Sequence, residues 1–204
     1  TLDSARYGEI TGYKGNGTQK LLEVLEKCSA MGIKTKVNAV LLEQTENDAP
    51  ELAGIAERLS VDVRFIELMP IGFGTTMKRV SPDDILAVLR ESWPDLAETD
   101  EKRGNGPAHY YKSSGLKGRI GFIDAVSHKF CSECNRVRLT STGMLKPCLC
   151  YSDTTDLRAL IRSGCKDEEL KSALERAVYQ KPRAHCFDDG AQITEQHIMS
   201  QIGG

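Results

Sequence analysis

The apolar residues near the start of the chain recur first at helical and then at strand spacing. Helical spacing from Thr18, taken as the N-cap, to Met31 predicts a helix, and Gly32 follows as a stop signal. Alternation of apolar and polar residues over residues 33–42 then predicts a strand. The chain therefore opens with a helix followed by a strand.

The same order repeats in the next segment. Asp48 and Glu51 form a potential capping box for a helix that runs through Leu59, and residues 61–69 are rich in strand-forming residues. A third helix is expected to start at Ser81. Helices and strands that alternate with short links are typical of a parallel sheet flanked by helices, so the fold class is expected to be α/β.

A polar, charged stretch at residues 95–107 predicts a linker between two domains, residues 1–95 and 96–204. A hairpin over residues 110–123 is expected to open the second domain. Two helices of this domain are expected at residues 157–161 and 167–179. Residues 181–204 have no apolar periodicity, and the histidines and Cys186 in this tail are interpreted as incidental.

The composition limits the class of protein. A chain of 204 residues with 40% hydrophobic residues can build one large or two small cores. A net charge of −2 gives no general attraction for nucleic acid or membranes, and no apolar run is long enough to span a bilayer. Seven cysteines, an odd number, indicate a reducing compartment, which means the cytoplasm or, in a eukaryote, the mitochondrial matrix.

Three cysteines have the spacing of a metal site. Cys131 and Cys134 are separated by two residues, and a hairpin would bring Cys148 back to them. Three thiolates suit zinc or an iron–sulfur cluster, and the spacing alone favours neither. A closed zinc site needs a fourth ligand, for which Cys150 and, less favourably, His128 are available.

Basic residues accompany both predicted domains. Arg136 and Arg138 are two positions apart, so in an extended strand they lie on one face beside the cysteines. Lys36, Asn38 and Arg64 lie in strands of the predicted parallel sheet. Such sheets are usually covered on both faces, which favours a ligand cavity for these side chains, and a solvated edge strand is the alternative.

The residues around the cysteines extend the pattern. It reads Cys131-x2-Cys134-Asn135-Arg136-x-Arg138-Leu139-Thr140, followed by Gly143-x-Leu145-x-Pro147-Cys148. Further motifs are Ile10-Thr11-Gly12, Arg64-Phe65-Ile66-Glu67-Leu68-Met69-Pro70, Gly118-Arg119-Ile120-Gly121-Phe122-Ile123 and the final Gly203-Gly204. Over nearly its whole length the chain resembles the GTP 3′,8-cyclase family, radical S-adenosylmethionine enzymes of molybdenum cofactor biosynthesis.

The resemblance implies a more specific fold and a specific metal. Residues 1–95 would be the last part of an incomplete TIM-like parallel barrel that binds S-adenosylmethionine. Residues 96–204 would be a smaller α+β C-terminal iron–sulfur domain that binds GTP. Cys131, Cys134 and Cys148 would hold a [4Fe-4S] cluster whose remaining iron the guanine base occupies.

The resemblance also implies the binding residues. The expected GTP contacts are Lys36, Arg64, Arg136, Val137 and Arg138. Met69 would contact S-adenosylmethionine, although the family often has an acidic residue where this chain has Pro70. Gly203 and Gly204 would reach into the active-site cavity.

The implied reaction converts GTP to (8S)-3′,8-cyclo-7,8-dihydroguanosine 5′-triphosphate. The family's N-terminal C-x3-C-x2-C motif does not occur here, so we expect either the C-terminal portion of a longer enzyme or a truncated gene product. S-adenosylmethionine and a second cluster are then expected in the full-length enzyme, and this span alone should be inactive. The expected partners are a second copy in a homodimer and a downstream enzyme that forms cyclic pyranopterin monophosphate. The alternative function is a non-catalytic, zinc-stabilised binding module.

Overall fold

In the computed structural model, which describes residues 1–152 and 154–202, five strands form a mixed sheet in the order β1-β2-β5-β4-β3. β1, β2 and β5 are parallel, and β3 and β4 complete the sheet in antiparallel fashion. The strands are β1 (Thr35–Val40), β2 (Val61–Ile66), β3 (Ala97–Thr99), β4 (His109–Lys112) and β5 (Ile120–Ile123). The expected α/β class is thereby confirmed.

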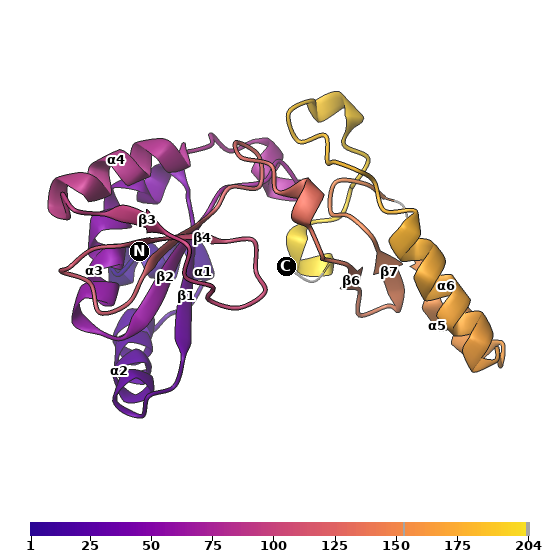
Figure 1. Ribbon diagram of the computed structural model, residues 1–204, viewed down its shortest axis with the longest axis horizontal. Helices are drawn as coiled ribbons and strands as arrows, with labels where there is room; N and C mark the ends of the chain where they lie inside the picture. Colours follow the sequence, from indigo (N-terminus) through magenta and orange to yellow (C-terminus); the bar gives the residue numbers. More distant parts are fainter. Residues whose placement is uncertain (153, 203–204) are drawn as a thin grey trace. The chain divides into compact units, whose positions relative to one another are not determined.

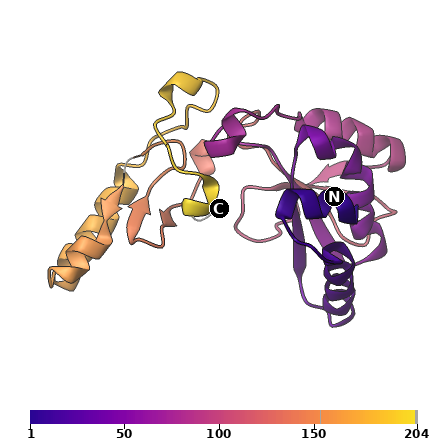
Figure 2. The same cartoon turned by 180° about the vertical axis from the view of Figure 1, so that it is seen from behind.

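Helices and sheet share one hydrophobic core. Residues Ile55 from α3, Leu89 from α4 and Phe65 from β2 belong to this core and have at most 1% of their surface exposed. Figure 1 shows the helices beside the sheet, and Figure 2 shows the N-terminal helix α1 from the other side. The helices are α1 (Ser4–Thr11), α2 (Gly17–Ala30), α3 (Ala49–Arg58) and α4 (Pro82–Ser92), with 3-10 turns η1 (Glu43–Asp48) and η2 (Gly72–Thr75).

Two predicted helix starts are wrong in detail. Thr18 is not an N-cap but lies inside α2, where its buried hydroxyl is 2.6 Å from the Ser4 hydroxyl. Asp48 precedes α3 without forming a capping box, because its carboxylate accepts a hydrogen bond of 2.6 Å from Arg6. In both cases a contact with the segment before α2 replaces the local cap.

The division of the chain differs from the predicted boundary at residues 95 and 96. Unit 1 comprises residues 1–68 and 78–128, and unit 2 comprises residues 69–77 and 129–204. The predicted hairpin exists as β4 and β5, but β5 pairs with β2, so the hairpin belongs to the first sheet. Because β3 also pairs with β4, the predicted linker at residues 95–107 is part of unit 1.

Unit 2 has a small sheet and a helical hairpin. The sheet is antiparallel in the order β6-β7-β8, and α5 and α6 lie side by side in both views (Figures 1 and 2). Both helices are where the sequence predicts them. The elements are η3 (Cys131–Glu133), β6 (Arg138–Leu139), β7 (Met144–Lys146), β8 (Thr155–Asp156), α5 (Leu157–Arg162), α6 (Asp167–Tyr179), η4 (Gly190–Gln192) and η5 (Met199–Gln201). None of the described helices has the length and apolar character needed to cross a membrane.

The tail of unit 2 is held by a buried ion pair. Lys146 of β7 forms an ion pair with Glu195, and their side chains are only 3% and 0% exposed. Lys146 also donates a hydrogen bond of 2.8 Å to the Tyr151 carbonyl. Burial raises the pKa of Glu195, but hydrogen bonds from Lys146 and from His197 outweigh this effect and leave the pKa below its ordinary value.

Gly118 lies where the chain entering β5 comes closest to β2. A Cβ atom at this position would be 2.0 Å from the Val61 carbonyl oxygen, a backbone atom held in the sheet. We therefore expect Gly118→Ala to lower the free energy of unfolding of unit 1 by about 3 kcal/mol. The fluorescence of Trp93, the single tryptophan and a core residue of unit 1, reports this transition in urea.

Gly54→Ala is the control in the same unit. A Cβ atom at Gly54 meets only the end of the Arg58 side chain, at 3.3 Å, and Gly54 lies in α3, where alanine is a better helix former. This variant should unfold at the same urea concentration as the original protein or higher. An equal loss in both variants would show that Gly118 is not a special contact.

Removing one member of the Lys146–Glu195 pair should destabilise unit 2. Glu195→Gln leaves the buried Lys146 charge without a counter-ion, which costs about 3 kcal/mol at pH 7. Amide hydrogen exchange in β7 should then become faster by on the order of a hundredfold. Because the carboxylate has a lowered pKa when folded, this contribution is complete above its unfolded pKa and disappears as the pH falls through the folded pKa.

Glu175→Gln tests the same chemistry on the surface. Glu175 is 3.9 Å from Lys171 on α6, and both side chains are more than half exposed. Exposed pairs of this kind contribute little, so exchange should remain unchanged. Similar amide exchange rates in Glu195→Gln and Glu175→Gln would show that burial of the Lys146–Glu195 pair does not increase its contribution to stability.

Candidate functional site

The first group of predicted site residues lies on one face of the unit 1 sheet. Lys36 and Asn38 are exposed on β1, where their apolar neighbours face the other way. Asn38 pairs with Arg64 of β2, and the Arg64 Nε donates a hydrogen bond of 2.8 Å to the Asn38 side-chain oxygen. The structure therefore brings Lys36, Asn38 and Arg64 to the same face.

The next two strands continue this row. Arg64 pairs with Gly121 of β5, and Gly121 pairs with Tyr110 of β4. A Cβ atom at Gly121 would be 3.1 Å from the Arg64 Cγ and 2.9 Å from the Tyr110 ring. The glycine thus leaves the space that both side chains fill.

Lys36 has two partners on this face, neither of which is an acid. Its ammonium donates a hydrogen bond to the Arg103 carbonyl oxygen and lies 5.7 Å from the centre of the Tyr110 ring. Among the residues that the structure describes, Lys36 and Arg64 form no ion pair. The two cations are therefore available for an anionic ligand.

The second group is the cysteine segment of unit 2. Cys131 starts the short turn η3, in which the Cys134 N–H donates to the Cys131 carbonyl at 3.2 Å. The antiparallel pairing of β6 with β7 then returns the chain to Cys148. All three thiols are free and partly exposed.

Hydrogen-bond donors surround these sulfur atoms. The Lys181 ammonium lies 3.3 Å from the Cys134 sulfur, and the His185 N–H lies 3.5 Å from the Cys131 sulfur. Burial raises the pKa of Cys148, the nearby thiols Cys131 and Cys134 add to the rise, and Lys181 opposes it. N–H groups and a cation next to sulfur are the environment that cluster thiolates require.

The thiols are gathered in one region, but they are not arranged as a finished ligand set. In residues 1–152 and 154–202, no group of three or more His, Cys, Asp or Glu side chains is arranged to hold a metal ion. The donor chemistry nevertheless fits an iron–sulfur cluster, since three thiols and their N–H donors belong to the same turn, hairpin and tail segment.

The two candidate fourth ligands have other partners. The Cys150 thiol is fully buried, 2.9 Å from the Cys186 thiol, and it also accepts a hydrogen bond of 3.2 Å from the Cys186 N–H. Burial, and then the contact with Cys186, raise the pKa of Cys150 to about 12. His128 lies in unit 1, where its Nδ1 is 3.2 Å from a carboxylate oxygen of Asp124.

The remaining predicted residues are on unit 2. Arg136 and Val137 are exposed, and Arg138 is partly buried at the start of β6. Burial, and then the neighbouring charge of Arg136, lower the pKa of Arg138. Met69 is partly buried and belongs to the short segment of residues 69–77 that is part of unit 2. The prediction for Gly203 and Gly204 concerns residues outside the part of the chain that the structure describes.

Two buried acids organise the segment that precedes the cysteines in the chain. Glu67 accepts hydrogen bonds of 2.8 Å from the N–H groups of Val126 and Ser127, and one of 2.5 Å from the Ser127 hydroxyl. Asp124 lies between two histidines, 3.3 Å from His109 and 3.2 Å from His128. Glu67 is therefore a structural residue, held by backbone and hydroxyl groups rather than by a lysine.

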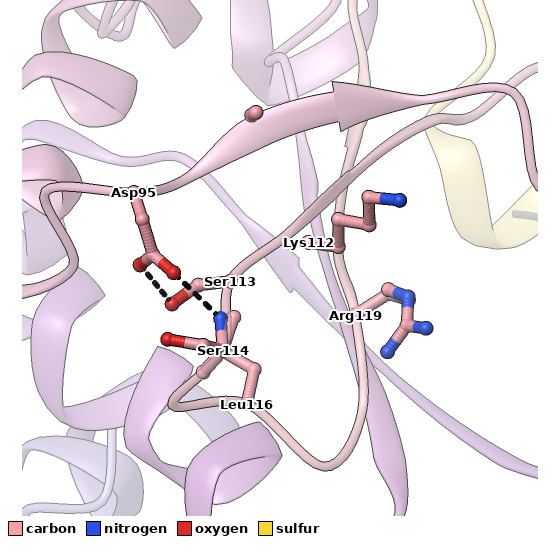
Figure 3. Close-up of a pocket in the computed structure, with 7 residues that line it drawn as sticks. Asp95, Lys112, Ser113, Ser114, Leu116 and Arg119 are labelled. Carbon is pink, nitrogen blue, oxygen red and sulfur yellow. Dashed lines mark hydrogen bonds between the residues drawn. The ribbon is translucent and has the colours of Figure 1, made fainter.

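A cavity of about 300 Å³ in unit 1 contains none of the predicted site residues. Figure 3 shows Asp95 bonded to Ser113 and Ser114, with Lys112 and Arg119 pointing away from it. The distances are 2.5 Å from the Ser113 hydroxyl and 2.8 Å from the Ser114 N–H, and these bonds lower the pKa of Asp95 to about 2. The Asp95 carboxylate therefore stabilises the turn between β4 and β5.

Several contacts in the candidate site could not be read from the sequence. Lys181 and His185 lie in the tail without apolar periodicity, yet the Lys181 side chain and the His185 backbone each contact a cysteine sulfur. Arg103 lies in the segment interpreted as a linker. Gly121 did belong to a recognised motif, and an isolated glycine inside a strand is a signal for close approach.

Comparison with known proteins identifies a family and named relatives for this chain. The family described as Molybdenum Cofactor Synthesis C matches residues 61–187, which include β2, β5 and the three cysteines. A relative from Clostridium perfringens strain SM101, named GTP 3′,8-cyclase, is 39% identical over 206 aligned residues, covering 100% of this chain and 63% of that protein.

Two further relatives carry the same name. The protein from Nitrobacter winogradskyi is 36% identical and aligns with 100% of this chain and 60% of its own length. The protein from Paracoccus denitrificans is 34% identical, with 99% and 58% covered. The chain thus spans between 58% and 63% of the length of these curated relatives.

Proposed function

This chain belongs to the Molybdenum Cofactor Synthesis C family, and we propose from that membership that it forms the substrate-side part of a GTP 3′,8-cyclase. The observation that carries the proposal is the cysteine segment, in which three thiols share one turn and hairpin and two of them accept hydrogen bonds from N–H groups. Relatives that bear this enzyme name align with the chain from end to end, which supports the same conclusion.

The proposed reaction converts GTP to (8S)-3′,8-cyclo-7,8-dihydroguanosine 5′-triphosphate with S-adenosylmethionine as co-substrate. The family resemblance assigns the S-adenosylmethionine cluster to a motif that does not occur in this span, so we expect the span by itself to be inactive. The chain's own contribution is to hold the nucleotide so that the ribose C3′ and the guanine C8 are close to each other. It also has to keep water away from them.

Cys131, Cys134 and Cys148 would hold the [4Fe-4S] cluster of this part. A cluster with three protein ligands supplies one iron that can act as a Lewis acid toward the guanine base. The Lys181 ammonium and the His185 N–H would offset the negative charge of the sulfur atoms. Cys150 would leave this iron available for the base, because its buried thiol is engaged with Cys186.

The basic residues would bind different parts of the nucleotide. Lys36 and Arg64 would bind the phosphates, since they are cations without ion pairs on one sheet face of the described chain. Arg136, Val137 and Arg138 would surround the guanine end, because they follow Cys134 directly. Met69 is proposed to contact S-adenosylmethionine on the family resemblance alone.

The incomplete barrel is the proposed origin of the exposed polar face. Parallel sheets are normally covered on both sides, whereas the face with Lys36 and Arg64 carries polar side chains. Within the described residues β1 pairs with β2 alone, which leaves its other edge for a further strand. Val24 and Met31 of the neighbouring α2 region are 54% and 74% exposed, as expected if additional barrel segments pack there.

Cellular context follows from the same proposal. All seven cysteines are free, which favours the cytoplasm, or the mitochondrial matrix if the source is eukaryotic. A homodimer, and a downstream enzyme that forms cyclic pyranopterin monophosphate, are proposed from the family resemblance. A zinc-stabilised module without chemistry is the alternative function, and the next experiment distinguishes it from the proposed one.

Metal content distinguishes cluster from zinc. After anaerobic reconstitution we expect brown protein with broad absorption at about 400 nm. It should contain about four iron atoms for each set of three cysteines. Cys134→Ser should lose most of this iron, whereas Cys150→Ser should retain it, because Cys150 contacts Cys186. Colourless protein with one zinc, or equal iron loss in both variants, would contradict the three-cysteine assignment.

Nucleotide binding tests the arginines. Arg136→Ala should weaken the affinity for GTP about tenfold through loss of a charged hydrogen bond, with iron content unchanged. Arg162→Ala is the control, since Arg162 lies at the end of α5, away from the cysteine segment in the sequence. The affinity of this variant for GTP should not change. Isothermal titration with equal affinities for the two variants would remove Arg136 from the proposed site.

A further inference from the structure

Residues 101–106, here called the strap, connect β3 to β4 and approach the face that carries Lys36. The strap contains one acid, Glu101, and one base, Arg103, that are tied to the sheet. Arg103 is 3.2 Å from Asp62 of β2 and 3.0 Å from Glu101, and Glu101 is 2.8 Å from Arg119. Asp62 also accepts the Arg119 N–H at 3.1 Å. The strap is therefore fixed to β2 and to the start of β5.

This network is balanced in charge. Its two arginines, Arg103 and Arg119, face two acids, Asp62 and Glu101, and Asp62 is buried. Hydrogen bonds from Arg119, and then from Arg103, lower the pKa of Glu101 to about 2, so the acid stays ionised at neutral pH. No charge of the network is therefore left over to neutralise Lys36.

The strap touches Lys36 through its backbone instead. The Lys36 ammonium donates to the Arg103 carbonyl, and the position of a Cβ on Gly104 would be 3.4 Å from the same nitrogen. The centre of the Tyr110 ring lies 5.7 Å from the same ammonium. A carbonyl dipole and an aromatic face orient an ammonium group without cancelling its charge, and a lysine has further N–H donors for a ligand.

We propose that the strap is a positioning element that holds the Lys36 ammonium ready for the phosphates of the nucleotide, with Arg103 as its anchor. The inference rests on the proposed function, because it takes the phosphate chain as the ligand of Lys36. A long lysine side chain loses much rotamer freedom on binding, and holding it in advance removes part of that cost. Gly104 suits this role because its φ of +100° disfavours any residue with a Cβ atom.

The test compares the affinities for GTP and for guanosine, which lacks phosphates, in the protein expressed from its complete gene. Arg103→Ala should weaken GTP binding about fivefold to tenfold and leave guanosine binding unchanged. Arg103→Lys should restore most of the loss, because it keeps a cation next to Asp62. Arg58→Ala, which changes an arginine at the end of α3, is the control and should alter neither affinity.

Gly104→Ala provides a second test that does not change a charge. It should also reduce the preference for GTP over guanosine, because the strap must shift. Gly32→Ala introduces similar backbone strain at φ +69°, with nothing within 4 Å, and should keep the preference. Thermal unfolding of all five variants tests whether they are folded.

The outcomes separate this inference from the function it rests on. Lys36→Ala must lower the preference for GTP over guanosine, and if it does not, the assignment of the phosphates to Lys36 fails. If Lys36→Ala lowers the preference while Arg103→Ala and Gly104→Ala leave it unchanged, only the role of the strap is overturned. Tighter GTP binding in the strap variants would also overturn it, because the strap would then obstruct the site.

Discussion

The parallel pairing of β2 with β5 is the constraint on which the polar face of unit 1 depends. It joins residues that are far apart in the chain, and it aligns Arg64 with Gly121. Gly118 permits the close approach, because a side chain there would collide with the Val61 carbonyl. The pairing has two consequences: the core face receives Phe65 and Phe122, whose rings are 5.6 Å apart, and the opposite face receives the row of polar side chains.

Local patterns in the sequence predicted the elements but not their partners. Alternation at Lys36 and Asn38 correctly places the two residues on one face of β1, and the helices α5 and α6 follow their apolar periodicity. The strap was interpreted as a linker because β3 has only three residues and its anchors are distant in sequence. A contact such as Arg103 with Asp62 leaves no periodic signal, so only the folded chain reveals it.

In the candidate site, too, the sequence reveals the local pattern but not the contacts between distant segments. The spacing of Cys131, Cys134 and Cys148 indicates a metal site, because a few ligand residues within a short segment are enough to form one. The groups that surround the sulfur atoms, Lys181 and His185, come from a tail that has no pattern of its own. That tail is held in place by non-local contacts, among them the buried ion pair of Lys146 with Glu195. The three candidate ligands are thus close together in the sequence, whereas the groups around their sulfur atoms come from a distant segment.

The central claim is that three cysteines hold a cluster with one iron that accepts the guanine nucleotide. Mössbauer spectroscopy of protein reconstituted with ⁵⁷Fe tests this claim most directly, because it resolves the individual iron sites. The account predicts a [4Fe-4S] spectrum in which one iron site differs from the other three and changes when GTP is added. A cluster whose four sites are equivalent and indifferent to GTP, or a site that takes up zinc in place of iron, would contradict it.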